Sequence, residues 1–157
     1  MKTLMTSLAA LYLLAGHGVA QSYDVEIVGY GEAENFFEAL SGTLMVNQSG
    51  STLNSFDGLE GTPLEGMTAR CFGFTTFLNG VAEGNGNCVF TDPDGHKVLQ
   101  AWTVDTVGEG VAHGTWHFVG GTGPHEGVIG RGYFDQESDT LTGARVLSIT
   151  GVAIWPE

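Results

Sequence analysis

The residues that could do acid–base or metal chemistry are few, and their spacing limits what they could do together. Beyond residue 20 the histidines are His96, His113, His117 and His125. An i, i+4 pair suits one zinc ion on a helix, but on a strand His113 and His117 would stand about 13 Å apart. No metal site and no cofactor are therefore expected. His96 falls in a predicted turn, whereas His125 is a candidate acid or base at the mouth of a pocket.

Three further sequence patterns resemble functional motifs but lack residues that those motifs require. Residues 120–123 are glycine-rich, but no Lys-Ser or Lys-Thr follows, so a nucleotide-binding loop is not expected. Asp92 and Asp94 resemble the start of a calcium loop, yet Thr103 stands where the closing glutamate belongs. No serine lies in a nucleophile-elbow pattern, which disfavours covalent hydrolysis. Acid–base chemistry in an apolar cavity remains, where burial or a nearby arginine moves the pKa of a carboxylate or tyrosine.

The candidate ligand-binding residues are aromatic and polar side chains on predicted strands. Trp102 and Trp116 are expected to form apolar walls, with Gln100, Arg131 and Tyr133 as polar anchors, because buried polar groups need partners and often meet ligands. The alternative for each tryptophan is plain core packing, and for Arg131 it is a structural salt bridge. No catalytic residue can be assigned.

Many short strands are expected to position these residues. The chain has 25 glycines among 157 residues, spread between runs rich in Val, Thr, Phe and Trp, which is typical of short strands with frequent turns. Only residues 32–40 are compatible with a helix. About eight strands with short connections predict an all-β fold, a single antiparallel eight-stranded β-barrel, because closure leaves no exposed strand edge.

One hairpin can be placed in register from its turn. Asn79 and Gly80 lie between two strand-like runs and form the preferred pair for a two-residue type I′ turn. That turn places Cys71 opposite Cys88 in a non-hydrogen-bonded pair, whose Cα atoms lie about 4.5 Å apart. Disulfides need roughly 4.4–6.8 Å. The sequence therefore predicts one cross-strand disulfide between Cys71 and Cys88.

A second turn at residues 92–95, with Pro93 and Gly95 at suitable positions, predicts the next hairpin. The two hairpins sort their residues onto two faces, and the less charged face is assigned to the interior, which places Phe72 and Phe74 outside. The predicted interior residues are Cys71, Gly73, Thr75, Phe77, Gly84, Gly86, Cys88, Phe90, Gln100 and Trp102. Residues 49–66 are predicted to be a long loop, either a lid over one barrel mouth or a packed surface loop.

The amino-terminal residues have the composition of a leader. Residues 1–20 combine Lys2, an apolar stretch and a small-residue site before Gln21, which predicts a signal peptide, and residues 21–157 then form one domain. No membrane span is expected, and the protein should be secreted or periplasmic, where the disulfide can form. The net charge of −13 repels phosphate backbones and anionic lipids, so no nucleic-acid partner is expected.

A glycine motif near the carboxyl terminus resembles a known family. The strand before Gly120 ends in a Gly-Gly-Thr-Gly run, and a second glycine-punctuated strand ends in an aromatic residue; the residues are Gly120, Gly121, Thr122, Gly123, Gly127, Gly130, Gly132 and Tyr133. This pattern is similar to one shared by plant dirigent proteins and allene oxide cyclases, and residues 88–95 resemble bacterial secreted relatives. The chain departs from the motif at Pro124 and His125, where a basic residue and Phe or Tyr are expected.

The resemblance implies an allene oxide cyclase-like or dirigent-like barrel whose cavity takes a small hydrophobic or aromatic ligand, often as a homo-oligomer, with cofactor-free chemistry. The first hypothesis is therefore a cyclase, isomerase or lyase. The second is a non-catalytic, lipocalin-like binding protein, and the third is a structural protein. A buried titratable pair in an open cavity would favour the first hypothesis, an apolar cavity the second, and a filled barrel the third.

Overall fold

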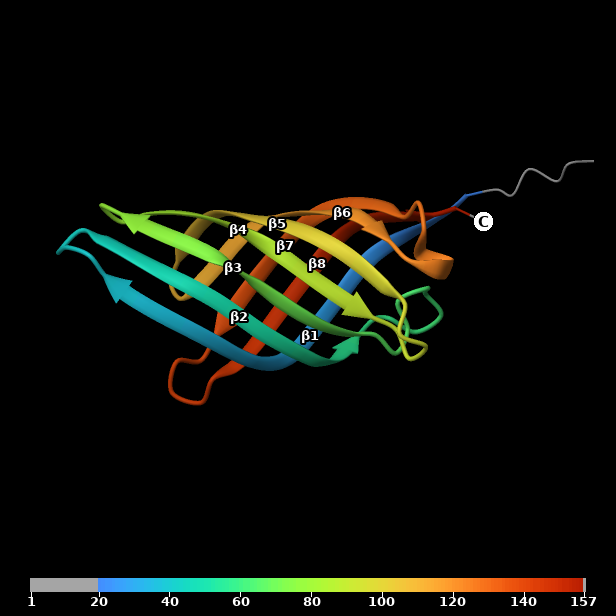
Figure 1. Cartoon of the computed structure of the whole chain (residues 1–157), viewed down its shortest axis with the longest axis horizontal. Coiled ribbons are helices and arrows are strands. Elements are labelled where there is room, and N and C mark those ends of the chain that lie inside the picture. The colour runs from blue at the N-terminus through green and yellow to red at the C-terminus, as the bar shows by residue number, and fades with distance from the viewer. Residues whose placement is uncertain (1–19, 157) are drawn as a thin grey trace, which may run out of the picture.

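Eight antiparallel strands form a closed barrel in the computed structural model, which describes residues 20–156 (Figure 1). Each strand pairs with the next along the chain, and β8 closes the ring against β1. The elements are β1 (Gln21–Ala39), β2 (Leu44–Asp57), β3 (Thr68–Leu78), β4 (Val81–Thr91), β5 (Lys97–Gly108), β6 (Val111–Gly121), the single-turn 3₁₀ helix η1 (Gly123–His125), β7 (Ile129–Ser138) and β8 (Ala144–Trp155). The predicted all-β, eight-stranded barrel is confirmed.

The first hairpin forms as predicted. Asn79 and Gly80 both have positive φ, 52° and 82°, as a type I′ turn requires. Cys71 pairs with Cys88 across β3 and β4, their Cα atoms are 4.0 Å apart, and they form the disulfide. Both cysteines point into the barrel, whereas Phe72 and Phe74 are exposed on its outer surface, so the predicted assignment of faces is correct for this hairpin.

Two segments differ from expectation, because both belong to long strands. Residues 32–40 were predicted as the stretch compatible with a helix, but residues 32–39 form the second half of β1 and pair with β2. A bulge at Tyr30 and Gly31 bends β1, and a Cβ at Gly31 would collide with the carbonyl oxygen of Thr52. The predicted loop 49–66 is wrong in its first half, since β2 continues to Asp57 and its side chains alternate between the inner and outer faces.

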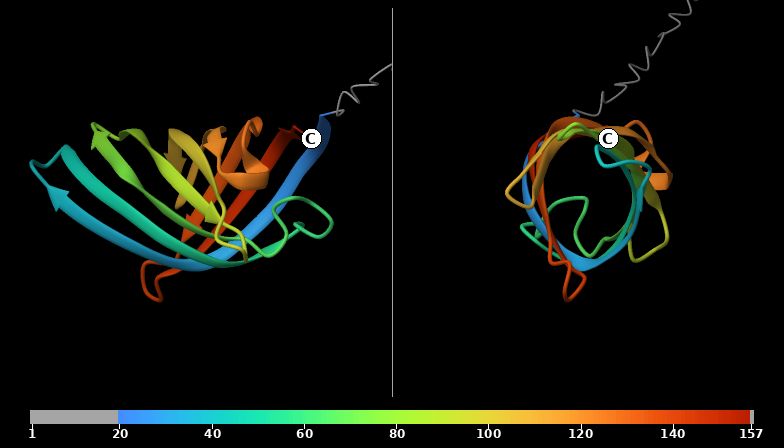
Figure 2. Two further views of the ribbon diagram at one scale, coloured as in Figure 1. Left: turned by 45° about the vertical axis from the view of Figure 1, so that its right-hand side comes forward. Right: turned by 90° about the vertical axis from the view of Figure 1, so that its left-hand side faces the viewer.

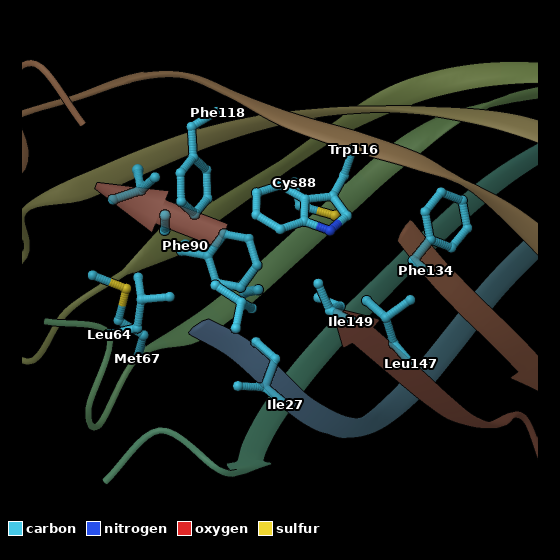
Figure 3. Close-up of a cluster of buried hydrophobic side chains, with 14 of the residues drawn as sticks. Ile27, Leu64, Met67, Cys88, Phe90, Trp116, Phe118, Phe134, Leu147 and Ile149 are labelled. Atoms are coloured by element: carbon cyan, nitrogen blue, oxygen red, sulfur yellow. The ribbon is translucent and has the colours of Figure 1, made fainter. Parts of the chain in front are cut away.

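The two ends of the barrel are built differently. At one end the strands are joined by tight turns, and the β1–β2 and β3–β4 hairpins extend beyond the other strands, as Figures 1 and 2 show. At the opposite end residues 58–67 fold inward and bury Leu59, Leu64 and Met67 in the same hydrophobic core as Phe90 and Val98. Figure 3 shows Leu64 and Met67 beside Phe90. The barrel is therefore packed at this end, which is called the closed end below.

No helix among residues 20–156 is long and apolar enough to cross a membrane. The predicted signal peptide lies outside the described part of the chain except for Ala20.

Candidate functional site

A cavity of about 210 Å³ lies inside the barrel at the end with the tight turns. All eight strands contribute to its wall, and the Cys71–Cys88 disulfide forms part of it. The inward-facing apolar residues of the lining include Phe37, Phe77, Trp102, Val104, Val107, Ala112, Phe134, Leu147 and Ile149. A cavity of about 150 Å³ is enough to hold benzene. This one therefore suits a single aromatic ring with a short substituent.

The position of Trp102 depends on two glycines. Gly73 and Gly86 face each other across β3 and β4, and a Cβ on either would collide with the Trp102 indole. The ring also packs edge-on against Phe134, with 6.4 Å between ring centroids. The glycines thus leave a slot that holds Trp102 against the barrel wall, where one side of the indole faces the cavity.

Arg145, at the start of β8, supplies the cationic group of the wall. Its side chain is only 3% exposed, and its guanidinium donates hydrogen bonds to neutral acceptors: Ser138 Oγ at 3.1 Å, Gly50 O at 3.3 Å, Asn35 Oδ1 at 3.3 Å and Ser49 Oγ at 3.4 Å. Burial lowers the pKa of Arg145 to about 10, so it is still protonated at neutral pH. Within residues 20–156 no carboxylate forms a salt bridge with it.

Neutral polar side chains complete the wall. Gln100 and Thr75 are buried and line the cavity. Asn47 also lines it, and its Oδ1 is buried without a hydrogen-bond partner among the described residues. An unsatisfied buried acceptor of this kind costs roughly 1–3 kcal/mol. A ligand that donates a hydrogen bond to Asn47 would recover that free energy.

The lining contains few groups that could exchange a proton. Among the described residues that line the cavity, Arg145 is the one charged side chain, and no Asp, Glu, His, Lys or Tyr is present. The two cysteines are joined in the disulfide and do not titrate. The wall can therefore bind, orient and polarise a molecule, but it offers no general acid or base of ordinary pKa.

The structure separates the five predicted ligand-binding residues. Gln100 and Trp102 line the cavity. Trp116 is buried in the core and donates its indole N–H to the carbonyl oxygens of Tyr133 and Thr150, at 3.2 and 3.0 Å, which is the packing role considered as its alternative. Arg131 and Tyr133 point outward, and Tyr133 is 70% exposed. The salt bridge considered for Arg131 is not found among residues 20–156.

Pairing explains why Arg131 and Tyr133 lie outside. Gly132 is opposite Trp116 on β6, so the glycine occupies the inward position and its two neighbours must face the other way. Gly130 is also inward, where a Cβ would lie 2.8 Å from the Phe118 ring. The glycine motif therefore makes room for core aromatic residues.

His125 has a structural position rather than one at the cavity mouth. It is buried in η1 at the closed end, where its Nδ1 accepts the indole N–H of Trp155 at 3.2 Å and its Nε2–H donates to Asp92 Oδ2 at 3.1 Å. Burial alone would raise the pKa of Asp92, but hydrogen bonds from His125 and from the His96 N–H outweigh it and hold the pKa below its usual value. His125, predicted as an acid or base, thus connects η1 with the β4–β5 turn and with β8 through hydrogen bonds.

Comparisons with known proteins identify the fold. No protein-family model and no curated protein matches this sequence. Among solved structures, a pterocarpan synthase dirigent protein is similar over 98% of this chain and 100% of its own, with a TM-score of 0.53 and 12% sequence identity.

The chain has a dirigent-like barrel fold. The likeness inferred from residues 88–95 and from the glycine motif at residues 120–133 therefore extends over the whole barrel. At 12% identity it establishes the architecture, whereas function depends on the side chains of the cavity.

Proposed function

We propose that this dirigent-like barrel is a secreted protein that binds a small, largely apolar molecule in its cavity. The observation that carries the proposal is the cavity itself, with aromatic and aliphatic walls and a few fixed polar groups, which is the usual composition of a small-molecule site. Binding is favoured over acid–base catalysis because no carboxylate, histidine or tyrosine is among the described lining residues.

The proposed location rests on the leader-like residues 1–20 and on the disulfide between Cys71 and Cys88. Disulfides persist in oxidising compartments and are rare in the cytosol. A secreted or periplasmic protein that carries or sequesters a ligand fits both features.

A cofactor-free cyclase, isomerase or lyase is the second candidate. It is supported by Arg145, because a buried cation in a low-dielectric wall can stabilise negative charge that develops on a substrate oxygen. One similar structure is that of a pterocarpan synthase dirigent protein, which supports a synthase activity here only by analogy of fold. In this version the barrel would supply orientation and electrostatics, and the substrate would supply the reactivity.

The test is binding of a neutral single-ring dye whose fluorescence responds to polarity, such as 4-(dimethylamino)benzonitrile, to the oxidised protein. Ala112 lines the cavity, so Ala112→Trp should fill it and abolish dye binding. Ala101 pairs with His117 on the outer face of β5, so Ala101→Trp is the matched control and should leave binding intact. Dye binding that is absent from the unmodified protein, or equal in both variants, would refute the proposal. Conversion of an added ligand to product would favour the second candidate.

A further inference from the structure

The charge of Arg145 is the least explained feature of the cavity. A buried cation is normally neutralised by a carboxylate, because an uncompensated charge in a low-dielectric interior is costly. Here Arg145 is only 3% exposed, and the partners of its guanidinium within residues 20–156 are two serines, an asparagine and a backbone carbonyl. The described part of the protein thus buries a positive charge and provides no carboxylate that pairs with it.

The hydrogen bonds of the Arg145 guanidinium are longer than those it would make with a carboxylate. The four neutral acceptors lie 3.1–3.4 Å from the guanidinium nitrogens, whereas hydrogen bonds from a guanidinium to a carboxylate are typically about 2.7–2.9 Å. Arg145 is also part of the cavity lining rather than sealed behind it. A ligand carboxylate could therefore approach the guanidinium of Arg145 and replace its longer hydrogen bonds to the neutral acceptors.

We propose that the natural ligand of this cavity is a small aromatic carboxylic acid, bound as its carboxylate by Arg145. This inference rests on the proposed function, since it names the ligand class of the same cavity. The ring packs against Trp102 and Phe134, and the carboxylate pairs with Arg145. A hydroxyl on the ligand donates to Asn47 Oδ1, the acceptor that has no partner among the described residues.

The second observation, the unpaired Asn47 oxygen, points to a ligand independently of the arginine. Asn47 and Arg145 come from different strands, β2 and β8, and both line the same cavity. The outer surface gives no help to an anion, because the chain carries a net charge of −13. Selection of a carboxylate must therefore come from groups inside the cavity.

A purely structural role for Arg145 makes a different prediction. The guanidinium connects β1, β2 and the β7–β8 hairpin through Asn35, Ser49 and Ser138. If that were its whole function, removing it would weaken binding of charged and neutral ligands equally. A role in recognition requires that the loss depend on the charge of the ligand.

The experiment compares 3-phenylpropanoate with its neutral amide by calorimetry on the oxidised protein. We expect the acid to bind at least about tenfold more tightly, since hydrogen bonds to charged groups contribute more than neutral ones. Arg145→Met should abolish this preference while changing the affinity for the amide less than about threefold. Arg131→Met, the same substitution on the outer face, should leave both affinities unchanged.

Two results would overturn the inference: equal binding of acid and amide by the unmodified protein, or a preference that survives in Arg145→Met. If the Met variant does not fold, Arg145→Gln removes the charge but keeps a donor for Ser49 and Asn35, and its preference should likewise disappear. Failure of the proposed function is distinguishable, because then neither the acid, nor the amide, nor 4-(dimethylamino)benzonitrile would bind. If the amide and the dye bind and the acid is not preferred, the inference of a carboxylate ligand is overturned, whereas the proposed binding of a small molecule stands.

Discussion

Removal of the disulfide tests the hairpin that forms one side of the cavity. In the variant Cys71→Ala, Cys88→Ala, the type I′ turn at Asn79 and Gly80 is still present, and the other pairs of the β3–β4 ladder can still form. We therefore expect the variant to keep the barrel at 25 °C but to unfold more easily.

The size of the loss follows from the closed loop. The two cysteines are 17 residues apart in sequence, and a cross-link over that distance restricts the unfolded chain by about 3 kcal/mol in the chain-entropy description. For a domain of this size, that corresponds to a decrease in Tm of roughly 10 °C. The truncation to alanine also removes two buried sulfur atoms from the core, which adds a smaller loss.

The assay is thermal unfolding followed by circular dichroism, with and without a reductant. The reductant should lower the Tm of the unmodified protein towards that of the double variant and should leave the variant itself unchanged. A loss below about 1 kcal/mol would refute the argument that the bridge restricts the unfolded chain. A variant without β structure at 25 °C would refute the argument that the turn alone sets the register.

Three further substitutions test the site and its supports. Gly86→Ala should cost about 1–3 kcal/mol of stability in urea unfolding, because its Cβ collides with Trp102, whereas Gly42→Ala, which has open space around it, should change stability by less than about 0.5 kcal/mol. Because the pKa of Asp92 is lowered in the fold, its ionised form stabilises the protein above its usual pKa and this contribution is lost as the pH falls through the lowered value. The urea midpoint should therefore fall more steeply on acidification below about pH 4 than in Asp92→Asn. Asn47→Leu should not lower stability, since the Oδ1 atom has no partner among the described residues, but it should remove any gain in affinity from a hydroxyl on the ring of 3-phenylpropanoate; a gain that persists would contradict the role given to Asn47.

The part of the site that could be predicted depends on local chemistry. The Asn79-Gly80 turn fixes the register of β3 and β4, and the turn at residues 92–95 extends it to β5, so Cys71, Gln100 and Trp102 lie on one face. No longer-range knowledge was needed, because turn type, period-two alternation and cysteine spacing agree.

The rest of the site could not be predicted from the sequence in the same way. Bulges between Leu99 and Gln100 and between Val104 and Thr106 interrupt the pairing of β5 with β6. Each bulge inserts a residue and shifts the alternation of faces. The inward and outward positions of the first hairpins therefore could not be used to predict which way Arg131 and Tyr133 point. The prediction for these two residues thus rested on residue type alone, and the structure places both outside.

Arg145 was missed although a signal was present. It precedes Leu147 and Ile149 at alternate positions of one strand, which is the spacing of an inward face. An arginine in phase with apolar residues indicates a buried charge, and therefore a candidate site. The burial of His125 beside Asp92 and Trp155 had no comparable signal, because it joins three segments far apart in the sequence.

The most direct test of the central claim is native mass spectrometry of the oxidised protein, purified gently from its own host. A cavity that serves as a ligand site predicts a population that carries one small organic molecule, released on denaturation and absent from Ala112→Trp. A single mass equal to that of the polypeptide, together with no adduct after incubation with 3-phenylpropanoate or its amide, would contradict the claim that this barrel binds a small molecule.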